Sequence, residues 1–260
     1  DPTMLFNRTR VTGWLGDFGK RESLLEDAGV ILTSNDAQAI HNALAEAKAY
    51  YRRDDFYDIK SGHDDTNNIT YSAVSALKGL EGRVFVLEAL LLADECTQMV
   101  KIAEEYCQNK LGGWTTSRHY AVPTTDVPIY SMPAVLSWFN KQLEICIFPV
   151  LRQQFNFLGR LRVFDAFFVK YDAIDGQNRL PVHNDQSVYS LTVAMNSLES
   201  YEGGGTYFAE TGEALKTDTG GMISFDGELL HAGKNIETGT RYIIACFLWV
   251  EKEQKQEEHE

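Results

Sequence analysis

The 260-residue chain is long enough to bury one sizeable core, and its hydrophobic and charged fractions are ordinary for a folded protein. A formal net charge of −13 argues against a nucleic-acid backbone as the main partner, because phosphate binding needs a basic surface. No apolar stretch reaches the roughly 20 residues that a membrane-spanning helix needs. No signal-peptide pattern opens the chain, and a start at Asp1 is compatible with a trimmed targeting segment. The sequence leaves the compartment and the oligomeric state open.

The first part of the chain predicts helices. Apolar residues recur at helical spacing in three segments, over residues 35–52, 94–108 and 133–155. Pro149 is expected to kink the third helix, because proline lacks the N–H that the helix needs. A polar loop over residues 54–68 and a buried strand over residues 84–92 lie between the first two helices.

From residue 161 onwards the chain predicts short strands. They are rich in aromatic and β-branched residues and are separated by glycine turns, over residues 161–171, 187–196, 206–209, 222–225, 229–233 and 241–250. The turn at Gly203–Gly205 reads as an ordinary hairpin. Short strands at this spacing are typical of a sandwich or barrel. The sequence therefore predicts an α+β fold, with helices first and a β-roll after them.

Cysteine and tryptophan are expected to serve packing. Each cysteine lies in an apolar, periodic segment, where a free thiol behaves as a small hydrophobe; they are Cys96, Cys107, Cys146 and Cys246. The four tryptophans are expected to belong to the core more often than to a substrate platform; they are Trp14, Trp114, Trp138 and Trp249.

Three potential metal ligands lie in the strand-rich half. His183 and Asp185 are separated by one residue, so on an extended segment both side chains point to the same face. His231 lies in another predicted strand and can complete one triangular face of an octahedron. Two histidines and one carboxylate, with the other positions open, form the ligand set of non-haem Fe(II) oxygenases. His63 and Asp65 repeat the pattern in a polar loop and are expected at the surface.

Arg241 is a candidate anchor for a cosubstrate. It follows His231 by ten positions, at the predicted start of the last strand. The open metal positions require a chelating acid, and the planar guanidinium fork suits the far carboxylate of such an acid. The following residues, IIACFLWV, predict that the guanidinium points inward instead of forming a surface ion pair.

These motifs are similar to those of a known family. His-x-Asp, a later His-x-Gly and Gly-Thr-Arg-Tyr before an apolar strand resemble the prolyl 4-hydroxylase-like branch of the Fe(II)- and 2-oxoglutarate-dependent dioxygenases. The segments YEGGGTYF, GGMISF and GTRYIIACFLWV look most like procollagen lysyl hydroxylase catalytic domains and their stand-alone relatives. The segment ALLLADECTQMVKIAEEY resembles the strand and helix that open such domains.

The resemblance implies a domain organisation and a set of cofactors. It implies a double-stranded β-helix, or jelly-roll, core over residues 86–250 with flanking N-terminal helices. An extension over residues 1–85 precedes this core and a charged tail over residues 251–260 follows it. The implied cofactors are Fe(II), 2-oxoglutarate and O2, with ascorbate as a further candidate reductant.

The resemblance also implies roles for individual residues. His183, Asp185 and His231 match the iron ligands of the family. Arg241 matches the basic residue that pairs with the distal carboxylate of 2-oxoglutarate. Tyr171, which ends the strand before the His-x-Asp motif, matches a tyrosine that hydrogen-bonds the cosubstrate.

The sequence leaves two classes of substrate open. Arg179, in the polar loop before His183, and Arg118 are candidates to bind a substrate carboxylate. They favour a small amino-acid-type substrate that is oxidised at an aliphatic C–H bond with release of succinate and CO2. The family resemblance favours peptidyl proline or lysine instead. Two further hypotheses are a catalytically silent β-roll, which the ligand set and Arg241 disfavour, and a nucleic-acid-modifying oxygenase, which the acidity disfavours.

Overall fold

A computed structural model of the chain describes residues 74–251 except residues 76, 117, 119–123, 175 and 186. The chain divides into two compact units, Asp1–Asp55 and Phe56–Glu260, and every described residue belongs to the second. Three predicted features lie outside the described residues: the helix at 35–52, the loop at 54–68 with His63 and Asp65, and Trp14. The predicted domain boundaries stay predictions.

Two antiparallel sheets form the core of the described part. The larger sheet has the order β1-β2-β10-β6-β12-β4-β3, with β7 paired to β12. Its strands are β1 (Val74–Ser75), β2 (Val84–Leu87), β3 (Asp126–Pro128), β4 (Arg160–Asp172), β6 (Tyr189–Ala194), β7 (Tyr201–Gly203), β10 (Met222–Asp226) and β12 (Ile236–Glu251). The smaller sheet has the order β5-β11-β8-β9. Its strands are β5 (Leu180–His183), β8 (Thr206–Phe208), β9 (Glu213–Leu215) and β11 (His231–Gly233).

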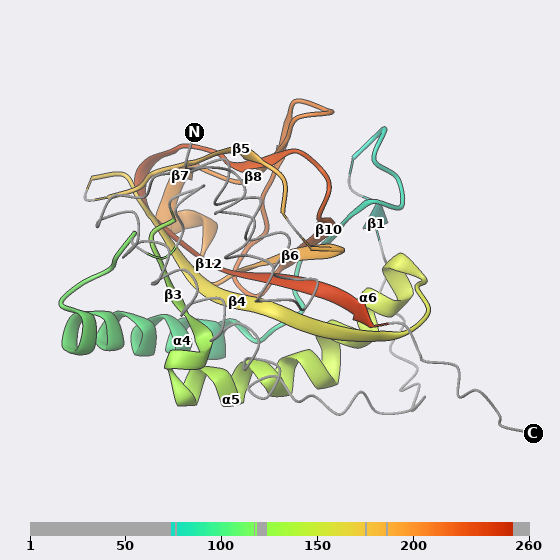
Figure 1. Ribbon diagram of the computed structural model, residues 1–260. Coiled ribbons are helices and arrows are strands. Elements are labelled where there is room, and N and C mark those ends of the chain that lie inside the picture. Colours follow the sequence, from blue (N-terminus) through green and yellow to red (C-terminus); the bar gives the residue numbers. More distant parts are fainter. Residues whose placement is uncertain are drawn as a thin grey trace, which may run out of the picture. The chain divides into compact units, whose positions relative to one another are not determined.

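Helices cover one face of the larger sheet, as Figure 1 shows for α4 (Ala93–Tyr106), α5 (Pro133–Gln142) and α6 (Phe148–Phe155). The helices and this face enclose the main apolar cluster, which includes Phe139 and Phe168. A second cluster joins Phe225 of the larger sheet to Phe208 of the smaller sheet on the opposite face. Helices on one side and a β-roll on the other confirm the predicted α+β fold.

Helix α4 follows its predicted stripe. Cys96, Met99 and Ala103 are buried along one side, and Cys107 continues the stripe into a π-helical turn, Cys107–Leu111. All four cysteines are buried and free, so the prediction that they act as small hydrophobes is confirmed. No helix of the described residues is long and apolar enough to cross a membrane.

The predicted helix at 133–155 is interrupted, and Pro149 explains the interruption. A π-helical segment, Leu143–Ile147, separates α5 from α6, and the proline lies in the first turn of α6. Because proline offers no N–H and its ring crowds the preceding turn, the wider π turn before it accommodates the break. The helix ends at Asn156, whose φ of 43° is the left-handed conformation that commonly ends helices.

Two strands differ most from their predicted bounds. The strand predicted to end at residue 92 ends at Leu87, because the N–H groups of Leu90 and Leu91 both bond to the carbonyl of Gly220. The last strand begins at Ile236, five residues earlier than predicted, so Arg241 lies inside β12. The short strands β1, β3, β5, β7 and β9 were not predicted.

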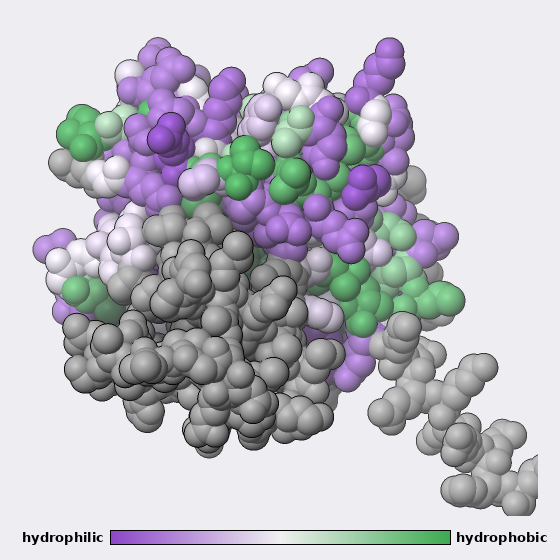
Figure 2. All heavy atoms as spheres, turned by 45° about the horizontal axis from the view of Figure 1, so that its top comes forward, coloured by the Kyte–Doolittle hydropathy of each residue, from purple (hydrophilic) through white to green (hydrophobic). Residues whose placement is uncertain are grey.

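The face of the larger sheet that lies opposite the helices is also apolar and faces the smaller sheet. Val169 and Tyr171 of β4 and Ile243 of β12 contribute to this face, together with Tyr201 and Ile236. On the face of the molecule in Figure 2, hydrophilic residues predominate and hydrophobic residues gather in small separate groups. The functional candidates lie between the two sheets.

Candidate active site

His183, Asp185 and His231 form one compact group where β5 meets β11. The cross-strand register places His231 opposite His183, and Asp185 follows β5 by two residues. Nε2 of His183 lies 3.4 Å from Oδ1 of Asp185, and Nε2 of His231 lies 3.4 Å from Oδ2. One donor atom from each residue lies within 4.8 Å of the other two. Metal–ligand bonds of about 2.0–2.2 Å place neighbouring donors ~3 Å apart, so this group fits a single ion.

Backbone carbonyls fix the orientation of both imidazoles. Nδ1 of His183 lies 2.8 Å from the carbonyl oxygen of Pro181, and Nδ1 of His231 lies 2.9 Å from that of Leu229. A carbonyl only accepts, so Nδ1 must carry the proton and donate it. In the neutral form of each imidazole this leaves the lone pair on Nε2, on the side of Asp185, which is the arrangement that metal-binding histidines require.

Asp185 is held by hydrogen bonds of its own. Its N–H donates to the carbonyl of Gly227 at 2.9 Å. Its Oδ2 accepts from the hydroxyl of Ser190 at 2.6 Å, and Ser190 lies 2.8 Å from the hydroxyl of Ser187. Gly227 packs so closely on Ser187 that a Cβ there would collide with its backbone. The carboxylate is therefore oriented before any ion binds.

The three titrating groups influence one another. Burial raises the pKa of Asp185, but hydrogen bonds from His183 and Ser190 and the charges of both imidazoles outweigh it, so the pKa lies below 3.8. Burial lowers the pKa of His183, but the hydrogen bond and charge of Asp185 raise it above 6.5. For His231 the effect of burial, which lowers the pKa, outweighs the charge of Asp185, which raises it, and the pKa falls below 6.5. Asp185 is thus ionised and His231 neutral at neutral pH.

A second buried group lies around Arg241. The register of β12 and β4 places Arg241 directly opposite Tyr171, with the guanidinium carbon 5.7 Å from the ring centre. Both residues are buried, and Tyr201 also hydrogen-bonds the guanidinium. Burial raises the pKa of Tyr171 to about 12 against the opposing charge of Arg241, so this phenol stays a hydrogen-bond donor.

The guanidinium retains unused hydrogen-bonding capacity. Nε of Arg241 is buried and has no hydrogen-bond partner among the described residues. Leaving a buried donor unpaired costs about 1–3 kcal/mol, and more when it is charged. An anionic ligand would satisfy this donor, so the group fits the distal carboxylate of 2-oxoglutarate.

Two glycines allow the chain to close around this group. A Cβ at Gly233 would lie 2.7 Å from the hydroxyl oxygen of Tyr171. Gly204 has a φ of +67°, and a Cβ there would lie 2.6 Å from Cδ1 of Ile236 and 3.4 Å from Cδ of Arg241. The turn that reads as an ordinary hairpin in the sequence therefore also packs against Arg241.

Arg118, a predicted substrate residue, is paired with two aspartates. Its Nε lies 2.9 Å from Oδ1 of Asp126 and its Nη2 lies 2.9 Å from Oδ2 of Asp165. Its guanidinium carbon also lies 5.3 Å from the ring centre of Phe167. Two carboxylates already match this charge, which disfavours capture of a substrate carboxylate by Arg118.

Arg179 occupies the predicted loop between β4 and β5. Its side chain is exposed, close in sequence to Leu180, where β5 begins. The carbonyl oxygen of the neighbouring Asn178 accepts a hydrogen bond from the N–H of Ile236 at 2.8 Å. A substrate role for Arg179 stays a prediction.

Sequence reasoning missed two residues of the site. Tyr201 lies in the quoted segment YEGGGTYF, but only the fold brings its side chain to Arg241. Ser190 is one of several serines in a strand, and nothing in its spacing marks it as a partner of Asp185. The contact of Tyr201 with Arg241 joins segments 40 residues apart, whereas Ser190 lies only five residues after Asp185 and is brought to it by the turn between β5 and β6.

Comparisons with known proteins agree with this arrangement. No family model matches the chain. The procollagen-lysine,2-oxoglutarate 5-dioxygenase 1 of Rattus norvegicus is 30% identical over 162 residues, which is 59% of this chain and 22% of that protein. The chain thus spans about a fifth of the length of this curated relative.

Two solved structures share the fold. An oxidoreductase of the 2OG-Fe(II) oxygenase family from Burkholderia pseudomallei has a TM-score of 0.50 at 9% identity, over 68% of this chain and 92% of that one. The non-heme alpha ketoglutarate dependent carbocyclase SnoK has a TM-score of 0.51 at 12% identity, over 68% of this chain and 86% of that one. At such identities the likeness concerns the fold.

The fold is therefore the jelly-roll of the 2-oxoglutarate-dependent oxygenases, as predicted. Within that class the sequence resembles the procollagen lysyl hydroxylases, which confirms the predicted likeness to the prolyl and lysyl hydroxylase branch.

Proposed function

We propose that this chain is an Fe(II)- and 2-oxoglutarate-dependent oxygenase whose metal ligands are His183, Asp185 and His231. The observation that carries the proposal is the convergence of three donor atoms within 4.8 Å, with Nδ1 of both histidines tied to carbonyls. When bound, iron and 2-oxoglutarate supply the oxidation of a C–H bond by O2, with release of succinate and CO2.

The residues around Arg241 bind and orient the cosubstrate. Arg241 pairs with the distal carboxylate of 2-oxoglutarate, for which its fork geometry is suited. Tyr171 and Tyr201 donate hydrogen bonds as neutral phenols, since burial raises the pKa of each. Burial of the whole group excludes water, which strengthens these charged contacts.

Two buried aspartates lie on the inner face of the larger sheet, which also carries Tyr171. Asp126 of β3 pairs with Val169 of β4, and Asp165 lies two residues before Phe167 on β4. Both aspartates therefore lie on the same face of the larger sheet as Tyr171. Both carboxylates are paired with Arg118. We infer an amino-acid-type substrate with an aliphatic, positively charged side chain, free or within a peptide. The relative's name, procollagen-lysine dioxygenase, agrees with this inference.

Succinate release tests the proposal. The chain is incubated with Fe(II), 2-oxoglutarate and a panel of free lysine, lysyl peptides, prolyl peptides and acidic amino acids. Substrate-dependent succinate is expected, with the largest rate for a lysine-type substrate. Iron and 2-oxoglutarate binding without succinate from any substrate would favour a silent binding protein. A prolyl peptide that turns over fastest would overturn the basic-substrate inference and retain the oxygenase.

Two variants separate the substrate groups. Asp165→Asn is expected to raise the KM for a lysine-type substrate at least tenfold and to leave the KM for 2-oxoglutarate unchanged. Arg179→Ala is expected to raise the KM for a free amino acid more than for the matched peptide, whose α-carboxylate is blocked. Equal effects on both substrates would remove Arg179 from carboxylate binding.

A further inference from the structure

Strand β12 changes its neighbour along one edge at the position of Arg241. On this edge it pairs with β7 up to Gly239 and with β6 from Ile243 onwards. The residues between these two ladders, 240–242, belong to neither. Backbone N–H and C=O groups in such a gap need other partners, because leaving them unpaired in a protein interior costs free energy.

The side chain of Asn196 fills this gap. Asn196 follows the end of β6 by two residues, after Met195, whose N–H donates to the carbonyl of Tyr242 at 3.0 Å. Nδ2 of Asn196 donates to the carbonyl of Thr240 at 2.8 Å, and its Oδ1 accepts from the N–H of Tyr242 at 2.8 Å. Because a carbonyl only accepts and an N–H only donates, the two partners also fix the orientation of the amide. One side chain thus holds the backbone immediately before and after Arg241.

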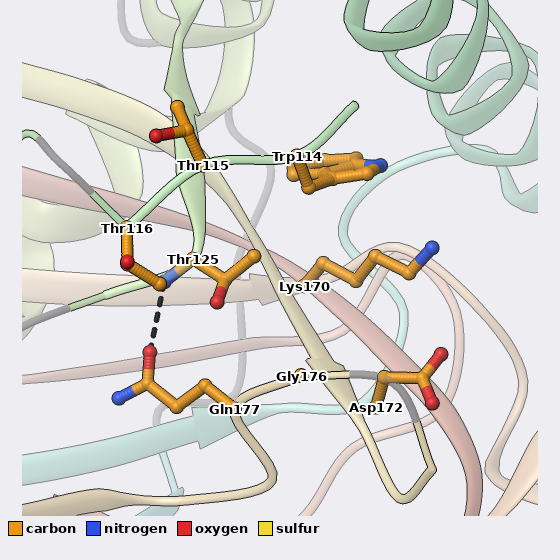
Figure 3. A pocket seen from close by; sticks show the side chains of 8 residues that line it. All are labelled: Trp114, Thr115, Thr116, Thr125, Lys170, Asp172, Gly176 and Gln177. Carbon is orange, nitrogen blue, oxygen red and sulfur yellow. Dashed lines mark hydrogen bonds between the residues drawn. The ribbon is translucent and has the colours of Figure 1, made fainter. Parts of the chain in front are cut away.

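The other edge of β12 is held by β4. The register pairs Arg241 with Tyr171, and the hydroxyl of Thr240 donates to Oδ2 of Asp172 at 2.9 Å. Asp172 lines the pocket in Figure 3, on the face of β4 opposite to Tyr171, since successive side chains of a strand alternate. The backbone of Arg241 is therefore fixed by a strand on one edge and by a side-chain amide on the other.

The position of this backbone determines where the guanidinium lies. The guanidinium carbon lies 5.7 Å from the ring centre of Tyr171, and Tyr201 hydrogen-bonds the same group. Because an arginine side chain is long, a small tilt of its backbone moves the guanidinium farther than it moves Cα. A binding group has to be held to within about 0.5 Å, and a misplacement of ~1 Å can cost about 100-fold.

We propose that Asn196 is a positioning residue for 2-oxoglutarate, which acts through the backbone of Arg241 without touching the cosubstrate. The inference rests on the proposed function, because it takes Arg241 as the partner of the distal carboxylate. Asn196 is neutral and half-buried, so its loss leaves the charge of the site unchanged. It removes both hydrogen bonds that bridge the β6 and β7 ladders, and β12 is then free to shift at Arg241.

The test compares two 2-oxo acids that differ only at their distal end. 2-Oxoglutarate and 2-oxopentanoate share the group that chelates a metal, but only 2-oxoglutarate carries a second carboxylate. The affinity of each for the full chain loaded with Co(II) is measured by calorimetry, and the ratio of the two Kd values gives the preference for the distal carboxylate. Asn196→Leu, which keeps the branched shape, and Asn196→Ala are each expected to reduce this preference about tenfold. The affinity for Co(II) is expected to stay unchanged.

Ser224→Ala is the matched control for general destabilisation. The buried hydroxyl of Ser224 donates to Oε1 of Gln154 at 2.6 Å and joins β10 to α6, away from Arg241. This variant is expected to lower the melting temperature and to keep the preference for 2-oxoglutarate. An equal loss of preference in Ser224→Ala would assign the effect to destabilisation and overturn the proposal.

A double substitution tests whether Asn196 acts through Arg241. In the Arg241→Ala background, Asn196→Leu is expected to cause no further loss of 2-oxoglutarate affinity, because two residues that act as one unit are not additive. A further loss as large as in the single variant overturns the proposal, and so does an unchanged preference in Asn196→Leu or Asn196→Ala that melts cooperatively. Equal affinity of the unsubstituted chain for the two 2-oxo acids would instead overturn the assignment of Arg241, and this inference with it.

Discussion

The metal cluster and the cosubstrate group lie in the same interior but are built differently. His183 and His231 lie on strands of only four and three residues, and each imidazole is fixed by a carbonyl two positions earlier in the chain. Arg241 and Tyr171 lie on strands of 16 and 13 residues, and only the pairing of those strands brings them together. Local hydrogen bonds orient the first group, whereas long-range register orients the second.

This difference predicts how each region responds to change. A substitution in the metal cluster is expected to remove the ion and leave the sheets intact, because the ligands stand at strand ends. A substitution in the cosubstrate group is expected to affect binding of the second ligand only, provided the β4–β12 pairing survives. The following variants test this separation, beginning with the largest expected effect.

Loss of any metal ligand is expected to abolish turnover. His183→Ala, Asp185→Ala and His231→Ala each remove one of three donors from a site that has no spare ligand among the described residues. Succinate release and Fe(II) affinity are measured together with the melting curve. Each variant is expected to melt cooperatively and to release no succinate. Full turnover in any one of them would contradict the assignment of that ligand.

Arg241→Ala is expected to weaken the binding of 2-oxoglutarate strongly and the binding of iron only slightly. Removing one partner of a buried charge pair costs about 2–5 kcal/mol, which corresponds to about 30-fold to 4,000-fold in affinity. Arg241→Lys is expected to restore part of the loss, because the charge returns without the fork. Arg83→Ala is a matched control, since its guanidinium forms a partly exposed ion pair with Asp226. A parallel loss of iron affinity in Arg241→Ala would show that the two regions are not separate.

The same contrast explains what the sequence could predict. The metal ligands follow from local rules, because a His-x-Asp on an extended segment orients both side chains together. The inward position of Arg241 follows from the apolar residues after it. Its neighbour Tyr201 depends on pairing between distant strands, which one sequence does not specify.

Arg118 illustrates a second limit of sequence reasoning. Its two partners, Asp126 and Asp165, lie on different strands, and β3 is too short to be recognised from its three residues. The long strand β4 was predicted nearly to its ends, whereas the bounds of β2 depended on hydrogen bonds to Gly220. Periodicity predicts long elements, and short ones depend on their neighbours.

Ser190→Ala tests whether the metal cluster is also oriented from outside its own strands. The hydroxyl donates to Oδ2 of Asp185 at 2.6 Å, and partners of this kind typically change metal affinity 10-fold to 100-fold. Fe(II) affinity is therefore expected to fall by about that factor, with 2-oxoglutarate affinity of the loaded protein unchanged. Ser187→Ala is the matched control, because this hydroxyl contacts Ser190. An equal loss in both variants would point to the serine pair instead of the single bond to Asp185.

The smallest expected effect is a pH dependence that only the metal cluster shows. Metal binding requires both imidazoles to be neutral, and the pKa of His183 lies above 6.5 while that of His231 lies below it. As the pH falls through the pKa of His183, metal affinity is expected to decline about tenfold per pH unit, and more steeply once His231 also takes a proton. Asp185 stays ionised throughout this range, because its pKa is held below 3.8.

Titration of the protein with Co(II) from about pH 8 to about pH 5 measures this dependence, because Co(II) is a stable substitute that the same ligand set accepts. Arg241→Ala is expected to show the same slope, since its substitution leaves the three ligands in place. A flat affinity across this range would mean that the imidazoles do not compete with protons for the metal. A slope that disappears in Arg241→Ala would instead couple the two regions, because the titrating group would then depend on the long strands for its position.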